Sequence, residues 1–298
     1  MISPAADRPA IPGAHLRNFC YPPELDRNGD RGGALPDPAE DYHEASKIHR
    51  DFPGRIFGPA RRFFETTPAA ATSLGRKSLG HAGEVTSLSR PDVLRSDLVA
   101  LSTTRRSGMP VDTGGIDLAE LGALLALSAG STPDEPELRS CPSAGAMYPV
   151  DLLVAVSDVA GLAPGSFVYD PIEHVLVRRA VGDAGQLHGC AAIGEPIPTG
   201  AVTFAFVCTF ARTRAKYGLR GYRFALLEAG HLAQAAITVA TALGLATLPW
   251  GGYLDQSVDE FLELDGTDRS CVYLLTIGGH DWTRRPDPEG TDETGPDT

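Results

Sequence analysis

The sequence predicts an α+β domain, and two features of its regular segments support this. Short strands and helices follow one another without the strict alternation of a doubly wound fold. The strongest helix signal, residues 222–243, is apolar on nearly every side and rich in Ala and Gly, which predicts a buried helix that packs closely against another. The sequence contains no internal repeat.

The other elements are predicted from local patterns and boundary residues. Asp117 is a suitable N-cap for a helix that Gly130 would end, and Ser257 is placed to cap a later one. The turn at Asp170–Pro171 predicts a hairpin. The expected helices cover residues 91–101, 118–128, 222–243 and 257–264. The expected strands cover residues 150–159, 166–170, 174–179, 201–210 and 271–278.

Three regions differ in composition. Residues 1–90 are weakly patterned and predict an irregular N-terminal extension, with a short helix and an extended arm within 41–62. Residues 91–280 hold the regular elements and form the predicted domain. Residues 281–298 are predicted to be a disordered acidic tail, because the stretch from Asp287 to Thr298 has five acids and no bases.

Composition argues against several function classes. A net charge of −12 disfavours nonspecific binding to nucleic acid or anionic lipid. No stretch is expected to cross a bilayer, and the first residues lack the apolar core of a secretory signal. Five scattered cysteines without a CxxC motif predict reduced thiols in a cytoplasmic protein.

Common catalytic and cofactor motifs are absent. There is no GxGxxG after a strand, which argues against a Rossmann nicotinamide site, and no GxSxG hydrolase motif. No metal site is predicted, since HExxH is missing too. Glu228 and His231 resemble half of a di-iron motif, but a second copy is lacking. We therefore interpret them as a hydrogen-bonded pair within a buried helix.

Two segments predict contacts with a phosphorylated, flat ligand. Arg105, Arg106 and Ser107 place two guanidiniums and a hydroxyl within three residues, a combination that can grip a phosphate. Residues 141–149 (CPSAGAMYP) form a turn of small residues that lets the backbone approach a flat molecule. Either segment alone also fits an ordinary surface loop.

Two further segments predict proton transfer and cofactor binding. Residues 216–223 (KYGLRGYR) begin with Lys216 and Tyr217, which could move a proton as a pair. Only three of the 26 basic residues are lysines, and a lysine can lose its proton where an arginine cannot. Residues 244–253 (GLATLPWGGY) predict a turn whose backbone N–H groups could bind a cofactor.

In this order and spacing, the four segments resemble nitroreductase-like flavoproteins. More narrowly, they resemble the SagB-type dehydrogenases, which oxidise azolines to azoles in ribosomally made peptides. The resemblance covers about residues 90–279 and rests on the combination PSAGAMYP, KYGxRGYR, EAGH and GL…GG. Residues 42–47 (YHEASK) are also similar to an N-terminal signature of that branch.

The resemblance implies an intertwined homodimer that binds FMN at the subunit interface, with an antiparallel or mixed sheet flanked by helices. By position, Lys216 and Tyr217 match the catalytic pair, and the Gly251 N–H would lie near flavin N5. Where family members carry a second basic residue, this chain has Met109. Arg106, or Arg284 with Arg285, would then neutralise the phosphate. The full set of implied cofactor contacts is Arg105, Arg106, Ser107, Pro142, Ser143, Ala144, Gly145, Pro249, Trp250, Gly251, Gly252 and Arg285.

The activity that the resemblance implies is the FMN-dependent oxidation of a thiazoline or oxazoline in a peptide, with Tyr217 as base and dioxygen as the expected final acceptor. Two alternatives stay open: an NAD(P)H-dependent flavin or ene-type reductase, and a non-catalytic partner of a heterocycle-forming complex. The expected partners are a modified peptide and a cyclodehydratase. Residues 1–90 would either recognise such a partner or simply wrap the dimer.

Overall fold

The structure, a computed structural model, describes part of the chain in two units, residues 1–47 and 48–298. The described residues are 38–47, 83–91, 96–108, 114–132, 134–179, 182–192 and 199–280. The predictions made for most of the N-terminal extension, for the acidic tail and for Met109, Arg284 and Arg285 lie outside these residues.

In the first unit, the structure describes one helix, α1 (Pro38–Ala45). It begins with a proline, whose fixed φ suits the first helical position. Past its end, the Ser46 hydroxyl donates to the Tyr42 carbonyl at 2.6 Å. The helix predicted within residues 41–62 therefore begins earlier than expected.

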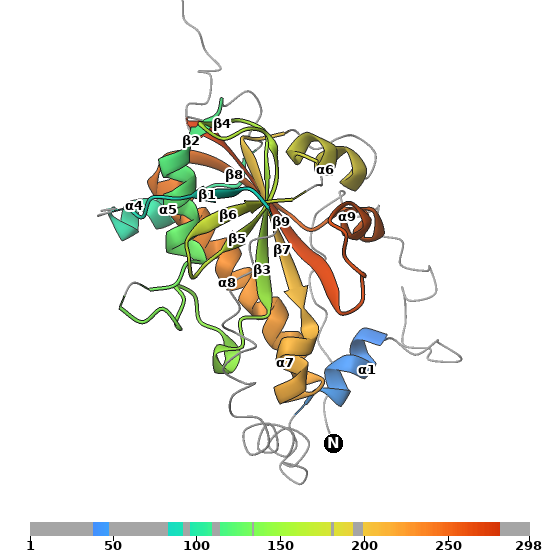
Figure 1. Ribbon diagram of the computed structural model, residues 1–298. Coiled ribbons are helices and arrows are strands. Elements are labelled where there is room, and N and C mark those ends of the chain that lie inside the picture. Colours follow the sequence, from blue (N-terminus) through green and yellow to red (C-terminus); the bar gives the residue numbers. More distant parts are fainter. Residues whose placement is uncertain are drawn as a thin grey trace, which may run out of the picture. The chain divides into compact units, whose positions relative to one another are not determined.

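The second unit is built on an antiparallel sheet (Figure 1). In the described part of the chain this sheet has seven strands, in the order β1-β6-β5-β3-β7-β9-β8, and every neighbouring pair is antiparallel. Its strands are β1 (Val85–Ser87), β3 (Val150–Val156), β5 (Gly165–Asp170), β6 (Val175–Arg178), β7 (Val202–Thr209), β8 (Leu245–Trp250) and β9 (Arg269–His280). A small parallel pair joins β2 (Ile116–Asp117) and β4 (Val159–Ala160). The predicted α+β class is confirmed.

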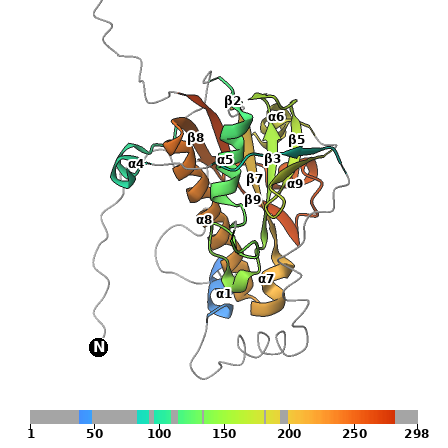
Figure 2. The same ribbon diagram turned by 60° about the vertical axis from the view of Figure 1, so that its left-hand side comes forward.

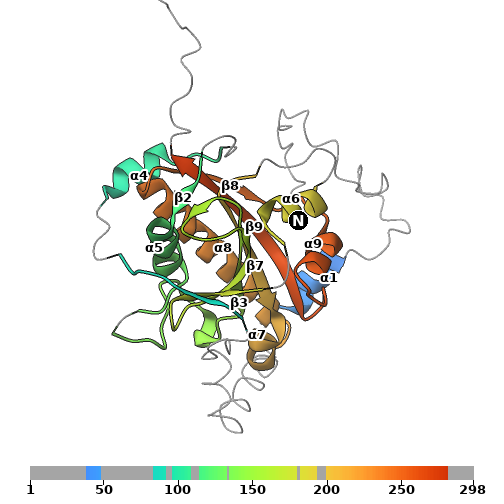
Figure 3. The same ribbon diagram turned by 45° about the horizontal axis from the view of Figure 1, so that its top comes forward.

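Helices cover both faces of the sheet (Figures 2 and 3). Alternate strand residues point to opposite faces, so Val154 and Phe206 pack beneath α5 and α8, while Ala155 and Val207 pack beneath α6 and α9. The helices of this unit are α4 (Leu98–Thr104), α5 (Leu118–Ser128), α6 (Ala184–Ala191), α7 (Phe210–Tyr217), α8 (Arg220–Ala242) and α9 (Asp255–Phe261).

Several local predictions are confirmed. Asp117 caps α5 in a capping box with Glu120, because each side chain binds the other's backbone N–H, at 2.7 and 2.8 Å. The hairpin at Asp170 joins β5 to β6 as expected. Four of the five cysteines lie in the described part of the chain, and all four are free thiols.

The long helix α8 is present where predicted, but it is not buried on every side. Its residues Leu226 and Leu227 are exposed, whereas Ala229 and Ala233 pack into the core. By length and composition alone α8 could cross a membrane, contrary to the expectation that no stretch would qualify. In this fold it packs on the sheet, and half of its most apolar window is buried.

Other elements differ from the sequence predictions. The sequence analysis did not predict helix α7, because β7 runs directly into it and the residue that caps it is distant in sequence. That residue is Asp268, which accepts hydrogen bonds from the N–H groups of Phe210 and Ala211, at 2.8 and 2.9 Å. Ser257 lies inside α9, which begins at Asp255, so it is not the cap. Within the described residues of the predicted 91–101 helix, the helix begins only after Asp97, which caps α4.

Candidate active site

Two of the predicted segments meet at Gly145. Lys216 is only 5% exposed, and its Nζ lies 5.1 Å from the centre of the Tyr217 ring. A Cβ atom added to Gly145 would overlap both the Lys216 Nζ and the Tyr217 hydroxyl. The side-chain nitrogen of Lys216, the phenol and the backbone of the small-residue loop therefore converge at one point. Proton transfer at this point stays a prediction.

The loop at residues 143–149 has an unusual backbone. Gly145, Ala146 and Tyr148 have positive φ angles of 63°, 53° and 43°. Residues other than glycine rarely adopt positive φ angles. Those that do cluster at functional sites, where the surrounding structure holds them in place. The loop exposes Gly145 and Ala146 while burying Met147 and Tyr148. It thus presents bare backbone at the position of the Lys216–Tyr217 pair.

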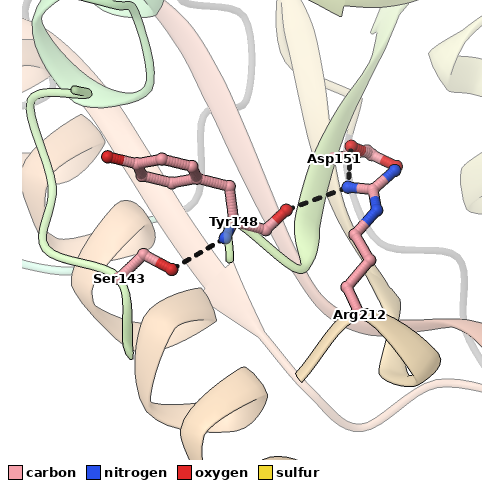
Figure 4. Close-up of polar contacts among 4 residues, drawn as sticks. All are labelled: Ser143, Tyr148, Asp151 and Arg212. Carbon is pink, nitrogen blue, oxygen red and sulfur yellow. Dashed lines mark hydrogen bonds and ion pairs between the residues drawn. The ribbon is translucent and has the colours of Figure 1, made fainter. Parts of the chain in front are cut away.

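Tyr148 is held by contacts from several elements (Figure 4). Its N–H donates to the Ser143 hydroxyl at 2.8 Å, and its carbonyl accepts from Arg212 at 2.9 Å. Arg212 also forms a bidentate ion pair with Asp151, at 2.7 and 2.8 Å. Arg212 and Lys216 are four residues apart on α7 and so share a helix face. The contacts that fix the loop therefore also fix the helix that carries the pair.

Replacing Arg212 with alanine is expected to destabilise the fold by about 3 kcal/mol, because it leaves the partly buried Asp151 carboxylate without its partner. Chemical denaturation measures this. Replacing Glu84, whose exposed carboxylate pairs with Arg178 at 3.4 Å, is the control and should cost less than about 1 kcal/mol. Equal losses in the two variants would contradict the role given to Arg212.

Glu228 of α8 lies beneath the same loop. It is 4% exposed, and its carboxyl faces Ser143 and Val150 at the two ends of that loop. Burial raises its pKa to about 7, against the opposing effects of Arg139 and Arg212. His231 is exposed, so the predicted Glu228–His231 pair is wrong: the buried Glu228 carboxyl faces the loop instead.

Because the pKa of Glu228 is raised in the folded chain, the stability of the fold should depend on pH. Between its ordinary value of 4.5 and about 7, the folded chain retains a proton that the unfolded chain releases, so the free energy of unfolding should fall as pH rises through this range. At about 1.4 kcal/mol per pKa unit, the loss is at most about 3 kcal/mol. Glu228→Gln should remove it. Urea unfolding of both proteins from about pH 4.5 to 8 tests this, and parallel pH profiles would contradict it.

The first and fourth predicted segments meet at the sheet edge. The Gly108 N–H donates to the Thr247 carbonyl of β8 at 2.9 Å, which places residues 105–108 beside that strand. A guanidinium nitrogen of Arg105 lies 3.4 Å from the Ser107 hydroxyl. Arg106 turns back to the Thr103 and Arg105 carbonyls at the end of α4. Arg105 and Ser107 are therefore the better placed of the three for a phosphate.

The predicted Pro249–Gly252 turn is only partly a turn. Pro249 and Trp250 are the last residues of β8, and the indole is buried in the core, where its Nε1 donates to the Thr276 hydroxyl at 3.1 Å. Gly251 and Gly252 follow and are exposed. Trp250 could therefore contact a cofactor only through its backbone. The backbone of the two glycines is exposed and open to such a contact.

Comparison with known proteins identifies the family. Residues 103–279, more than half of the chain, match the nitroreductase family. The chain belongs to the nitroreductase family. It is 32% identical over 183 residues to a nitroreductase-family protein of Methanocaldococcus jannaschii, covering 61% of this chain and 92% of that one. Family membership makes it an oxidoreductase.

A second relative points to a branch of that family. The chain is 29% identical over 237 residues to the microcin B17-processing protein McbC of Escherichia coli, covering 74% of this chain and 86% of McbC. Its fold matches a chain of the E. coli microcin synthetase McbBCD complex with truncated pro-MccB17 bound, with a TM-score of 0.54, 22% identity and coverage of 82% and 92%. The chain is thus a nitroreductase-like protein of the SagB and McbC type.

Some site residues of this nitroreductase-family chain escaped sequence reasoning. The sequence analysis gave no role to Arg212 and Asp151, because it did not predict helix α7. The four-residue spacing of Arg212 and Lys216, which places them on one face of a helix, would have been the signal. Tyr273 lies about 3.8 Å from a Cβ added to Gly251. A bulge between β7 and β9 at Val272 lets both Val272 and Tyr273 pack on the α8 side, and nothing in the sequence signals that bulge. In the small-residue loop, Pro142 is exposed and Ala144 is half-buried, and the cofactor contacts implied for them stay predictions.

Proposed function

We propose that this protein is an FMN-dependent dehydrogenase that oxidises thiazoline or oxazoline rings to azoles in a ribosomally made peptide. The observation that carries the proposal is the buried Lys216 beside Tyr217, both against the Gly145 backbone. This pair matches the catalytic residues of the SagB-type dehydrogenases that the sequence resembles. Similarity to a microcin-processing protein supports a peptide as the substrate.

The residues at the β8 edge fit FMN. Arg105 and Ser107 offer a cation and a hydroxyl for the phosphate, and residues 105–108 are bonded to β8. Beyond the end of that strand, Gly251 and Gly252 are exposed, and a Cβ on Gly252 would meet no other atom within 4 Å. A planar ring can therefore approach the backbone N–H groups there. When bound, FMN would supply the acceptor for the two electrons and the proton that leave the ring as hydride.

The chain's own residues would handle the other proton. An azoline becomes an azole by losing a proton from one ring carbon and a hydride from its neighbour. In the proposed site, the Tyr217 phenolate takes the proton and becomes the neutral phenol, and the positive charge of Lys216 lies at the same point of the Gly145 backbone as the Tyr217 oxygen. The bare backbone of Gly145 leaves room for the substrate ring to reach both groups. Phe224, edge-on to Tyr217 at 5.0 Å, holds the phenol in orientation.

The first test of this proposal is the visible absorption spectrum of the purified protein, with the released cofactor identified by mass. We expect the bands of bound oxidised flavin and the mass of FMN. A colourless protein that takes up no added FMN would contradict the proposal and favour a non-catalytic partner. Rapid bleaching by NADPH without oxygen would instead favour a flavin or ene-type reductase.

We also propose that the protein works as a homodimer. Helix α4, next to the proposed phosphate contacts, has no buried residue, and its Leu98 and Val99 are 72% and 71% exposed. These two side chains on α4, and separately Leu227 on α8, leave apolar surface exposed that a second copy would cover. Analytical ultracentrifugation tests this. A monomer that binds FMN with full affinity would contradict it.

A cyclodehydratase that makes the azoline is the proposed partner, in the cytoplasm. The similarity to McbC supports a place in peptide processing. Deleting residues 1–40 tests whether the N-terminal extension takes part: pull-down of the partner would be lost if it does and retained if the extension serves only the dimer. Cell fractionation tests the location.

A further inference from the structure

The two exposed glycines that follow β8 lie between two buried aromatic side chains. Trp250 is the last residue of β8 and Tyr253 follows Gly252, and the two rings meet edge-on with their centroids 5.9 Å apart. Both aromatic residues are buried, whereas Gly251 and Gly252 between them are exposed. The backbone proposed to meet the cofactor is therefore a two-residue segment anchored at each end by a side chain in the core.

Both aromatic side chains bind β9. The Trp250 Nε1 donates to the Thr276 hydroxyl at 3.1 Å, and the Tyr253 hydroxyl donates to the Cys271 carbonyl at 2.9 Å. Burial raises the pKa of Tyr253, so the phenol keeps the proton that it donates. Strand β9 pairs with β7 on one side and β8 on the other, so it gives the two anchors a fixed base inside the sheet.

The residue that accepts the indole N–H belongs to a buried polar cluster. Thr276 lies directly opposite Thr203 of β7, and their hydroxyl oxygens are 3.0 Å apart. The Nε2 atom of His188 on α6 lies 2.8 Å from the Thr203 hydroxyl and 3.1 Å from that of Thr276. An indole N–H can only donate, while a hydroxyl can donate and accept at once. Thr276 can therefore bind both the cluster and the indole of Trp250.

Anchoring matters more for two glycines than for other residues. Glycine loses more conformational freedom on ordering than any other residue, so a ligand that had to order Gly251 and Gly252 itself would bind more weakly. We propose that Thr276 is a positioning residue for the cofactor: by binding the indole of Trp250, it orders the Gly251–Gly252 backbone before FMN binds. The proposal rests on the FMN-dependent function proposed above.

The experiment compares Thr276→Val with Thr203→Val in the full chain. Both substitutions keep the branched shape and remove a fully buried hydroxyl that contacts His188, but only the Thr276 hydroxyl accepts the indole N–H. Titration of the FMN-free protein with FMN should give a Kd about tenfold higher for Thr276→Val, the effect of about one hydrogen bond. Thr203→Val should lose stability while keeping its affinity for FMN, and Thr276→Ser, which retains the hydroxyl, should restore the affinity.

Hydrogen exchange in the FMN-free protein measures the order of the segment directly. The peptide covering residues 247–254 is protected at one end by the pairing of β8 with β9 and at the other by the bond from the Leu254 N–H to the Ala191 carbonyl, at 3.1 Å. Exchange in this peptide should be faster in Thr276→Val and unchanged in Thr203→Val.

Tyr253→Phe removes the other anchor and provides a second variant. It should also raise the Kd for FMN, and the double variant with Thr276→Val should bind FMN more weakly than either single one. Its control is Tyr169→Phe, which removes a buried hydroxyl that bonds the His174 Nδ1 at 2.8 Å on β5, away from β8 and β9 in the sheet. That control should lose stability and keep its affinity for FMN.

An unchanged Kd for FMN in Thr276→Val, or an equal rise in Thr203→Val, would overturn the proposal. A parent protein that takes up no FMN would refute the proposed function instead. Faster exchange in Thr276→Val but not in Thr203→Val would then still show that Thr276 orders the two glycines.

Discussion

Replacing Lys216 with alanine or Tyr217 with phenylalanine is expected to lower turnover about 10²–10⁴-fold, the usual contribution of a positioned acid or base. FMN binding should persist, because both residues lie at the Gly145 loop and the proposed phosphate contacts lie beside β8. Steady-state oxidation of an azoline peptide gives the rate, and the flavin spectrum gives the cofactor content.

The control for the lysine variant is Arg214→Ala, which removes a positive charge from an exposed position of the same helix. It should leave turnover within a few-fold of the parent. If Lys216→Ala and Tyr217→Phe both turn over at near-normal rates, the assignment of the pair as proton-transfer residues is wrong.

Gly145→Ala is expected to have the second large effect. An added methyl group would overlap the Lys216 Nζ and the Tyr217 hydroxyl, so the pair and the loop must move apart. A displacement of about 1 Å at reacting groups costs on the order of 10²-fold in rate. The positive φ of 63° adds about 1 kcal/mol of backbone strain. Turnover and thermal stability would both be measured.

Gly161→Ala separates the two causes. Gly161 has a comparable positive φ of 85°, but an added Cβ would meet no atom within 4 Å. Both variants should lose similar stability from the backbone strain, and only Gly145→Ala should lose turnover. Equal activity in the two variants would show that the contact with Lys216 and Tyr217 does not matter for the reaction.

The sequence predicts elements well where their determinants are local. Helix α5 carries its capping box within four residues, and the β5–β6 hairpin carries its own turn. The Lys216–Tyr217 pair and the small-residue loop were found because their order along the chain matches a family, and the structure brings them together at Gly145.

Features that depend on distant residues could not be found in this way. Asp268 caps α7 from 57 residues away, so a helix beginning directly after a strand gave no local start signal. Trp250 was taken for a turn residue, but β8 extends to it and Thr276 binds its indole in the core. Glu228 looked like one member of a helical pair, since only the folded chain places Ser143 and Val150 above it.

The most direct test of the dehydrogenase assignment is to mix the FMN-loaded protein with an azoline-containing peptide without oxygen. We expect the oxidised-flavin absorbance to bleach in proportion to the rings present, and mass spectrometry to find each converted ring two hydrogens lighter. Loss of both signals in Tyr217→Phe would tie the reaction to the site. A flavin that stays oxidised with the peptide unchanged, but bleaches at once with NADPH, would contradict the dehydrogenase assignment.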